Sequence, residues 1–571
     1  MYGWTGRTVI IDLSDSRVTQ IESDANLLKA FIGGRGLGVK MYYDAIGPGV
    51  DPFAPENPLI FATGPLTGTA APMSGRHAMV SKSPLTGTIF DSSSGGFFGK
   101  ELKFAGIDAL VIKGAADEPV YISIQDDDIE IHPAGELWGM NTRACTDKLS
   151  SGGRVACIGR AGERLVPIAS VMNDYFHACG RGGLGAVMGS KKLKAVVVKG
   201  DKRPAIADEE GFRKARQDAI RLIEAGPMSS KGLHTYGTSA LVSLMSYMKL
   251  LPVRNFRETE FGGTDRVSGE FIKENYEIKG STCYNCMIAC KHIIKSGALE
   301  GHEVPEYETL WAFGPDNSNA DMDAIIRINR LCNDYGIDTI SSGSTIAAYA
   351  EIMGEDVEEL SVLVKKIGES EGIGKELGKG SKALARSRGK DAAMHVKGLE
   401  LPGYDPRGLL GMALAYATSN RGGCHLRAYM VAPEVLGKPK KVDPRTFSGK
   451  AGLVKVFQDA LAALDSLVLC KFTSFDMSEG EFASLLSAAT GVDYSTEEFL
   501  KCGERIWNLE RLFNTRAGFS RKDDTLPERF FGSGGINREE FEKALDEYYS
   551  FRGWDENGVP TEEKLGELGL G

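Results

Sequence analysis

The spacing of apolar residues changes once along this chain of 571 residues, and the change limits the folds open to it. Up to about residue 205 the apolar residues form short β-branched runs separated by glycine and proline, as at 59–62, 110–112 and 195–198. Runs of this length and composition predict strands. Beyond the polar segment 200–204, apolar residues recur every three or four positions, which predicts helices over 212–223 and 322–332. A β-rich first part and a mainly helical remainder are therefore expected.

The length of the chain exceeds what one hydrophobic core usually supports, so we expect several domains. A first boundary is predicted near residue 205 and a second, less sharply placed, between 395 and 405. The expected domains are a β-rich one at 1–205 and two mainly helical ones at 206–400 and 401–571. The sequence shows no heptad pattern and no repeat with a period of about 20–50 residues, which excludes coiled coils and solenoids.

Charge and hydropathy exclude several classes of function. The formal net charge is −10 and the basic residues are scattered among acidic ones, whereas nucleic-acid binding needs a basic face. An anionic lipid surface is disfavoured for the same reason. The first residues contain no basic run followed by an apolar core, and no later segment is apolar over the length needed to cross a bilayer. We expect a cytoplasmic protein that binds neither nucleic acid nor membrane.

Ten cysteines are too few for a disulfide-stabilised chain of this length, and three of them lie close together. Cys283, Cys286 and Cys290 form a C-x2-C-x3-C pattern, which places three thiolates on one short segment. A [4Fe–4S] cluster normally takes four cysteines, and the fourth can come from a distant part of the chain. Zinc and ordinary core cysteines are the alternatives, but zinc sites usually show a second compact pair of ligands nearby. The pattern favours an iron–sulfur cluster.

The chain contains 70 glycines, well above the usual share, so much of its backbone must turn sharply or approach another group closely. Two segments, 92–99 and 181–190, are especially glycine-rich, and Arg76 and Arg181 could add positive charge to them. Such segments can direct backbone N–H groups at an anion. Neither matches G-x-G-x-x-G or the P-loop, so a nucleotide fold is not indicated. Sharp turns in a β-rich domain are the alternative interpretation.

Two further patterns carry polar groups suited to binding or proton transfer. The hexapeptides 333–338 and 465–470 begin with a polar acceptor and end with Asp338 and Cys470, so both could hydrogen-bond a heterocycle. Taken singly, each is more typical of a helix C-terminus. Glu308 and His425 are residue types used for proton transfer, although a lone Glu is usually a solvated or capping carboxylate and a lone His an interior one.

Together these segments closely resemble the aldehyde ferredoxin oxidoreductase family of tungsten enzymes, and the resemblance runs from Met1 to the final residues 565–569. The motifs that carry it are T-G-P-L-T-G at 63–68, K-S-P-L-T-G at 82–87, G-R-G-G at 180–183, Y-D-P-R-G at 404–408 and R-G-G-C-H at 421–425. The resemblance implies an α+β fold, in which an N-terminal domain of two β-sheets forms a base for a metallopterin. Two mainly α-helical domains would cover that base.

The cofactor implied by the resemblance is a tungsten ion held by four dithiolene sulfurs of two pterins (tungstopterin), in which molybdenum could take the place of tungsten. The pterin phosphates and a bridging Mg2+ ion would be held by residues of the first domain, namely Arg76, Ser93, Gly95, Arg181, Gly182 and Gly183. The two hexapeptides match the family's pterin-binding pair, which assigns pterin contacts to Asn333, Ile337, Asp338, Asp465, Cys470 and Lys471. Cys470 would also be the fourth cluster ligand beside Cys283, Cys286 and Cys290. The chain departs from the pattern at Asn333 and Val468, where the family has Asp and Gly.

The resemblance also implies the reaction of an aldehyde:ferredoxin oxidoreductase, the oxidation of aldehydes to carboxylic acids. Glu308 would take a proton from the attacking water, with His425 and Tyr404 as hydrogen-bonding partners of the substrate. Electrons would leave singly through the cluster to ferredoxin or to a small ferredoxin-like subunit. Two alternatives stay open. One is the tungsten subunit of an aromatic acyl-CoA reductase-like complex, in which Cys424 or Cys332 could bind the metal; the other is an electron-transfer iron–sulfur protein without metallopterin.

The chain also departs from the family pattern at a motif that some members use to form a dimer. Some family members form a dimer bridged by a mononuclear iron, which is bound by a Glu-x-x-His motif just before the first hexapeptide. This chain has Arg327-Ile328-Asn329-Arg330 at those positions. Guanidinium groups stay protonated and have no lone pair to offer a metal. We therefore expect no iron-bridged homodimer.

Overall fold

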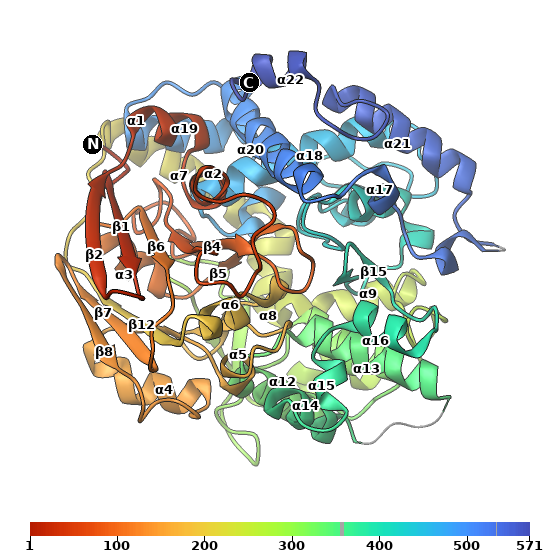
Figure 1. The fold of residues 1–571 in the computed structure, drawn as a ribbon. Helices are drawn as coiled ribbons and strands as arrows, with labels where there is room; N and C mark the ends of the chain where they lie inside the picture. Colours follow the sequence, from red (N-terminus) through yellow and green to blue (C-terminus); the bar gives the residue numbers. More distant parts are fainter. Residues whose placement is uncertain (355–358, 533) are drawn as a thin grey trace.

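The computed structural model describes residues 1–354, 359–532 and 534–571. Within these ranges the first 200 residues form two six-stranded sheets, and the rest of the chain is mainly helical (Figure 1). The strands of the two sheets are β1 (Arg7–Asp12), β2 (Arg17–Glu22), β3 (Leu59–Ala62), β4 (His77–Lys82), β5 (Ile89–Ser94), β6 (Ala109–Lys113), β7 (Val120–Gln125), β8 (Asp128–Pro133), β9 (Arg154–Cys157), β10 (Val171–Asn173), β11 (His177–Cys179) and β12 (Leu193–Lys199). The first sheet has the order β2-β1-β6-β3-β4-β5 and the second β11-β10-β9-β12-β7-β8. The pairs β1–β6 and β12–β7 are parallel, and their neighbours pair antiparallel.

The predicted change from strands to helices is confirmed. The helices among the sheets are α1 (Ala25–Phe31), α2 (Gly34–Ala45), α3 (Phe98–Phe104), α4 (Thr142–Leu149), α5 (Arg160–Glu163) and α6 (Leu184–Ser190). Those that follow are α7 (Glu209–Ala225), α8 (His234–Tyr236), α9 (Ala240–Tyr247), α10 (Gly269–Asn275), α11 (Tyr307–Phe313), α12 (Met322–Tyr335), α13 (Thr339–Met353), α14 (Leu360–Glu369), α15 (Gly374–Leu377), α16 (Ser381–Arg388), α17 (Leu410–Thr418), α18 (Lys450–Leu467), α19 (Glu479–Thr490), α20 (Thr496–Arg516), α21 (Arg538–Arg552) and α22 (Glu562–Leu568). No helix in the described ranges is long and apolar enough to cross a membrane.

The two helices predicted from periodicity begin at side-chain caps. The Asp208 carboxylate accepts a hydrogen bond from the Gly211 N–H (2.9 Å) at the start of α7, and Asp321 accepts one from Ala324 (3.0 Å) at the start of α12. These caps satisfy backbone donors that have no partner within the first turn. Helix α12 buries the apolar face that predicted it, whereas α7 buries Phe212, Ala219 and Ile223 and leaves Leu222 exposed.

The two sheets share one hydrophobic core. Val9 of β1 lies in the same buried cluster as Ile122 of β7 and Val196 of β12, together with Leu102 of α3 and Val187 of α6. The sheets therefore fold as one unit, against which the later helices pack (Figure 1). The predicted division of the chain into three domains stays a prediction.

Helix α2 is an element that the sequence pattern does not indicate. It holds Gly34, Gly36 and Gly38 within its first five residues, and glycine disfavours a helix interior by about 1 kcal/mol per residue. Burial outweighs this cost, because α2 packs between β4 of the first sheet and α18 and α20 of the C-terminal part. It carries the buried side chain of Arg35 towards the site described next.

A hairpin of β13 (Ile278–Ser281) and β14 (Lys291–Ile294) holds the cysteine-rich segment 283–290 as its loop. A second small hairpin pairs β15 (His395–Val396) with β16 (Leu399–Glu400). The first hairpin fixes both ends of the loop, so the three cysteines are presented from a defined base.

Candidate active site

A cavity of about 410 Å³ lies where the N-terminal sheets meet the helical part of the chain. One wall comes from the ends of β4 and β5 and from residues 176–181. The opposite wall comes from the cysteine loop, α11, the turn between α12 and α13, residues 421–429 and residues 465–475. The residues that sequence analysis assigned to the site line this cavity, with the exceptions of Gly182 and Gly183.

Four cysteines gather at one end of the cavity. Cys283, Cys286 and Cys290 lie on the hairpin loop, and Cys470 begins the short 3₁₀ segment Lys471–Phe475. All four are half-buried, whereas the other six cysteines are buried. Burial, and in addition the neighbouring Cys470 thiol, raises the pKa of Cys286 and of Cys290. Thiols that oppose each other's ionisation suit a shared iron–sulfur cluster, which supplies the compensating positive charge. Among the described residues, no three His, Cys, Asp or Glu side chains are grouped to hold a single metal ion.

Arg76 lies beside these cysteines. Its Nη2 donates a hydrogen bond to the Ser93 carbonyl oxygen at 3.0 Å. Burial acts to lower the pKa of Arg76, but the Cys470 and Cys283 thiols outweigh it and the pKa is raised. A Cβ atom on Gly95 would lie 3.0 Å from the Cys283 Sγ, so only glycine lets this strand end approach the cysteine loop so closely. The predicted anion-binding residues and the predicted cluster ligands are therefore neighbours.

Gly182 and Gly183 do not line the cavity but shape the turn beside it. Their φ angles are 87° and 75°, in the left-handed region. A Cβ atom would come within 2.4 Å of the Phe90 ring at Gly182 and within 2.1 Å of the Pro167 carbonyl oxygen at Gly183. Both positions therefore require glycine, and the turn they form carries Arg181.

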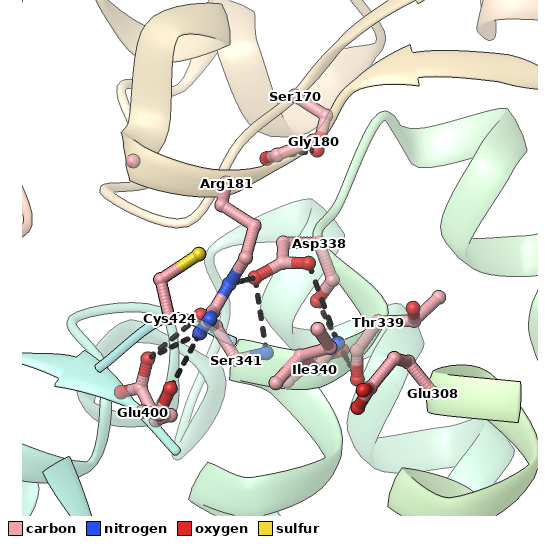
Figure 2. A network of polar contacts seen from close by, with 12 residues as sticks. Ser170, Gly180, Arg181, Glu308, Asp338, Thr339, Ile340, Ser341, Glu400 and Cys424 are labelled. Carbon is pink, nitrogen blue, oxygen red and sulfur yellow. Dashed lines mark hydrogen bonds and ion pairs between the residues drawn. The ribbon is translucent and has the colours of Figure 1, made fainter. Parts of the chain in front are cut away.

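The Arg181 guanidinium joins three parts of the chain (Figure 2). It donates hydrogen bonds to the Asp338 carboxylate (3.3 Å), the Glu400 carbonyl oxygen (2.8 Å) and the Gly423 carbonyl oxygen (3.0 Å). The Glu400 carboxylate in turn accepts a hydrogen bond from the Ser341 hydroxyl at 2.7 Å. Arg181 thus brings its charge to the cavity and also fixes the N-terminal domain to helix α13 and to β16.

Both hexapeptides connect the end of one helix to the start of the next segment. Gly336 ends α12 with φ 68°, and Asp338 then caps α13 by accepting a hydrogen bond from the Ser341 N–H at 3.1 Å. Val468 ends α18 with φ 62°, and Cys470 precedes the 3₁₀ segment. The helix-end interpretation is therefore correct for both hexapeptides, and it does not conflict with binding, since both turns line the cavity.

Val468 departs from the family pattern at a strained position. A β-branched residue in the left-handed region costs about 1–3 kcal/mol, and glycine would avoid this cost. The side chain of Val468 lies directly over Gly34 and Gly64, where a Cβ atom would come within 2.3 Å and 2.8 Å of its Cγ2. Buried packing against these two glycines offsets part of the strain.

A buried charge cluster lies behind the second hexapeptide. Its members are Arg35, Asp91, Arg427, Asp465, Lys471 and Glu510. Asp465 lies 2.7 Å from the Lys471 Nζ and 3.1 Å from a terminal nitrogen of Arg427. Burial acts to raise the pKa of Asp465, but Lys471, Arg427 and Arg35 outweigh it and lower the pKa. The carboxylate is therefore ionised and held in place at the edge of the cavity.

Glu308, His425 and Tyr404 also line the cavity and lie close to one another. The Glu308 Oε2 accepts a hydrogen bond from the Gly403 N–H at 3.0 Å, and its Oε1 lies 3.6 Å from the His425 Nε2. The Tyr404 ring lies beside the His425 ring, and its hydroxyl is 3.3 Å from that of Tyr429. Burial raises the pKa of Glu308 to about 8 and lowers that of His425 well below its usual value. A carboxyl group and a neutral imidazole thus lie side by side, buried in the cavity wall.

Several buried polar atoms of this cavity have no hydrogen-bond partner among the described residues. They are the Glu308 Oε1, the His425 Nδ1 and the Nε atoms of Arg421 and Arg427. Buried polar atoms normally have partners, so such a set indicates room for a polar ligand. The cationic donors and the four thiols that line this same cavity fit anionic pterin groups and an iron–sulfur cluster.

Sequence models of the aldehyde ferredoxin oxidoreductase family match most of the chain. The N-terminal domain matches residues 8–200, and domains 2 and 3 match residues 214–570. The chain belongs to the aldehyde ferredoxin oxidoreductase family. It is 43% identical to the tungsten-containing aldehyde ferredoxin oxidoreductase of Pyrococcus furiosus, over 100% of this chain and 99% of that protein. The protein of the same name from Thermococcus kodakarensis is also 43% identical, with the same coverage.

A solved structure of this fold has a different described role. The active site complex BamBC of benzoyl coenzyme A reductase, in complex with 1,5-dienoyl-CoA, has a TM-score of 0.89 to this chain at 25% identity. The match covers 100% of this chain and 97% of the other. The family and the α+β fold predicted from the sequence are confirmed, and the roles of individual site residues stay predictions.

Two features of this family member were not predicted from its sequence. Lys291 forms ion pairs in the cavity wall with Glu303 and, at 2.8 Å, with Glu306. Arg427 bridges Asp91 and Asp465 in the buried charge cluster. The only signal in the sequence is adjacency, because Lys291 directly follows the third cysteine of the motif and Arg427 lies two residues after His425.

The α12 helix of this family member lacks an iron-binding motif. Arg327 lies 3.5 Å from Asp323, and Arg330 lies 2.9 Å from Asp334, each one helical turn away. Since both arginines are engaged as cations, we expect about four iron atoms per chain from a single cluster and none at this helix. Metal analysis combined with the mass of the assembly in solution checks this. About half an additional iron per chain, in a dimer that dissociates on chelation, would contradict it.

Proposed function

We propose that this chain oxidises aldehydes to carboxylic acids and passes the electrons to ferredoxin. The observation that carries the proposal is one cavity that is lined both by Glu308 and His425 and by four cysteines. Such a cavity joins a site for proton transfer to a site for electron transfer. The 43% identity to tungsten-containing aldehyde ferredoxin oxidoreductases over the whole chain supports the same reaction.

The proposed cofactors are a tungstopterin, in which molybdenum could replace tungsten, a [4Fe–4S] cluster and a Mg2+ ion between the pterin phosphates. Arg76, Ser93, Gly95 and the turn at 181–183 would hold the phosphates, and the two hexapeptides would hold the pterin rings. Cys283, Cys286, Cys290 and Cys470 would hold the cluster. When bound, the metallopterin supplies a two-electron acceptor and a metal that polarises the substrate oxygen.

Glu308, His425 and Tyr404 would position the substrate and move its proton. The Gly403 N–H fixes one oxygen of Glu308, which leaves Oε1 free to accept a proton from a water or from an aldehyde hydrate. His425, which is neutral because burial lowers its pKa, can hydrogen-bond the substrate oxygen. The Tyr404 ring stacks on the Tyr307 ring, with centroids 5.0 Å apart. These aromatic rings exclude water from the part of the cavity that holds Glu308 and His425.

The pH dependence of the reaction should reflect the ionisation of Glu308. Because burial raises its pKa to about 8, the ionised form that accepts a proton becomes more abundant as the pH rises through that value. We expect kcat/KM for aldehyde to rise between about pH 6.5 and 9 with an inflection near 8. The same profile measured for Glu308→Gln should lack this inflection, and its persistence there would assign the inflection to another group.

Anaerobic purification followed by metal analysis and an aldehyde panel with a viologen dye tests the function. We expect tungsten or molybdenum together with iron, and dye reduction that depends on aldehyde. Iron without either heavy metal would instead support an electron-transfer protein lacking metallopterin. A cytoplasmic location and a small ferredoxin-like subunit as an alternative acceptor belong to the same proposal.

A second candidate function is that of an acyl-CoA reductase-type tungsten subunit, which the likeness to BamBC favours. Cys424 lines the cavity, whereas Cys332 does not. Burial acts to raise the pKa of Cys424, but Arg421, Arg427 and Arg181 outweigh it and lower the pKa to about 7. Its Sγ already accepts hydrogen bonds from the Arg421 Nη2 at 3.0 Å and the Leu426 N–H at 3.3 Å, which favours a structural role. A fifth sulfur in the tungsten coordination spectrum would support the reductase.

A further inference from the structure

Aromatic rings gather beside the cysteine loop, and one of them, Phe104, is buried. Tyr284, which follows the first cysteine of the motif, contacts Phe97 and Phe104 edge-on, with ring centroids 6.5 Å and 6.3 Å apart. The adjacent Asn285 is exposed, and its side chain donates hydrogen bonds to the Ala70 and Ala71 carbonyl oxygens. The tip of the loop is thus fixed to the N-terminal domain rather than left free in solution.

Four cationic side chains surround this group. Lys100 lies 4.6 Å and Arg203 3.8 Å from the centroid of the Phe104 ring, and Arg154 lies 4.7 Å from that of Phe97. Arg216 of α7 donates a hydrogen bond to the same Ala70 carbonyl oxygen that Asn285 contacts. We call the surface formed by Lys100, Arg154, Arg203, Arg216, Phe97, Tyr284 and Asn285, which covers the buried Phe104 ring, the basic aromatic surface.

Two of the four cations already have acidic partners, since Lys100 forms an ion pair with Glu101 and Arg154 lies 3.5 Å from Asp174. Glu101 accepts a hydrogen bond from the Gly200 N–H, and Asp174 accepts them from the N–H groups of Phe97 and Phe98. Their side chains are only 14% and 8% exposed, whereas that of Arg154 is 47% exposed.

Arg203 and Arg216 form no ion pair with any described residue, so their charge is not neutralised within the chain. These two arginines therefore place unpaired positive charge beside the loop, although the whole chain carries a net charge of −10.

We propose that the basic aromatic surface is the docking site for an acidic iron–sulfur protein that takes electrons from the cluster one at a time. The inference rests on the proposed function, because it needs electrons to arrive at the four cysteines. An aldehyde and a water yield a carboxylic acid, two protons and two electrons, and each oxidised partner molecule accepts one of these electrons. Charge complementarity selects the partner: a positive patch on an otherwise acidic chain steers an acidic protein to this face and repels it elsewhere. Arginine and aromatic side chains supply the contacts that most often dominate binding energy.

The test uses the intact holoenzyme, an acidic [4Fe–4S] ferredoxin as protein acceptor and a small viologen dye as a second acceptor. The variant is Arg203→Glu combined with Arg216→Glu. The control, Arg445→Glu combined with Lys543→Glu, changes the net charge equally at exposed positions, and α21, which carries Lys543, lies across the molecule from α3 (Figure 1). In the first variant we expect KM for ferredoxin to rise at least about tenfold at low salt and its salt dependence to weaken. Viologen-linked turnover should stay unchanged in both variants.

Binding measured by titration calorimetry separates this inference from the proposed function. If wild-type holoenzyme fails to oxidise any aldehyde with viologen, the proposed function is wrong, yet the Kd for ferredoxin still tests the surface. The conservative change Arg203→Lys with Arg216→Lys should retain most of the affinity, because it keeps the charge. Equal Kd and KM values for ferredoxin in the reversal variant, the control and the wild type would overturn the docking site.

Discussion

Cys470→Ser is expected to remove most of the cluster iron and to lower viologen-linked aldehyde oxidation by at least about a hundredfold. A cuboidal cluster needs its fourth corner, and, after burial, the neighbouring Cys470 thiol is what most raises the pKa of both Cys286 and Cys290. A serine hydroxyl is a poor ligand for iron at neutral pH. Iron content and the EPR signal of the dithionite-reduced protein measure the first effect, and dye reduction measures the second.

Cys502→Ser provides the matched control for this change. Cys502 is buried in α20, away from the cavity, and its thiol lies 3.8 Å from the Lys29 carbonyl oxygen. The same substitution there should leave iron and EPR signal intact. Full iron content with an unaltered EPR signal in Cys470→Ser would remove that residue from the ligand set.

Glu308→Gln is expected to keep the metals and the fold but to lower kcat by about 10²–10³, the range usual for loss of a general base. Glutamine can still accept the hydrogen bond from the Gly403 N–H, so the side chain should stay in place. Its amide cannot take a proton at Oε1. Steady-state kinetics with viologen, together with tungsten and iron analysis of the same sample, measure the effect.

Glu306→Gln is the internal control, since this carboxyl group lies in the same cavity two residues earlier. Glu306 forms an ion pair with Lys291 at 2.8 Å, and that charge lowers its pKa, so it is a weaker base than Glu308. We expect a much smaller loss of kcat. If Glu306→Gln disables the enzyme and Glu308→Gln does not, the roles of the two carboxyl groups are reversed.

The sequence predicts those parts of the fold whose signal is local. The short apolar run at 59–62 lies in a buried central strand, and the apolar face of 322–332 becomes the buried face of α12. Helix α2 could not be predicted, because its glycines disfavour a helix locally and only packing against β4, α18 and α20 stabilises it. Tertiary contacts override local propensity there.

The candidate site likewise has residues that a local sequence pattern identifies and residues that it does not. The spacing of Cys283, Cys286 and Cys290 identifies the cysteine loop directly, whereas Cys470 was assigned only through the resemblance to the family. The contact between Arg35 and Asp465 joins residues 430 positions apart, and no pattern in the sequence marks it. The pKa of Glu308 likewise depends on burial by distant segments, so the residue type alone could not indicate it.

The buried charge cluster behind the second hexapeptide also determines how this chain can come apart. Arg35 and Asp91 belong to the sheet-containing first part, whereas their partners come from the C-terminal part of the chain, Asp465 and Glu510 from helices α18 and α20 and Arg427 from the segment after α17. Leaving one such ion buried without its partner costs about 3–5 kcal/mol, a large share of the 5–15 kcal/mol that typically stabilises a folded protein. The two ends of the chain are therefore coupled in unfolding, and melting should be a single cooperative event. A large cofactor must then enter where the chain opens locally along another boundary between the sheets and the helices. At that boundary no ion pairs have to separate.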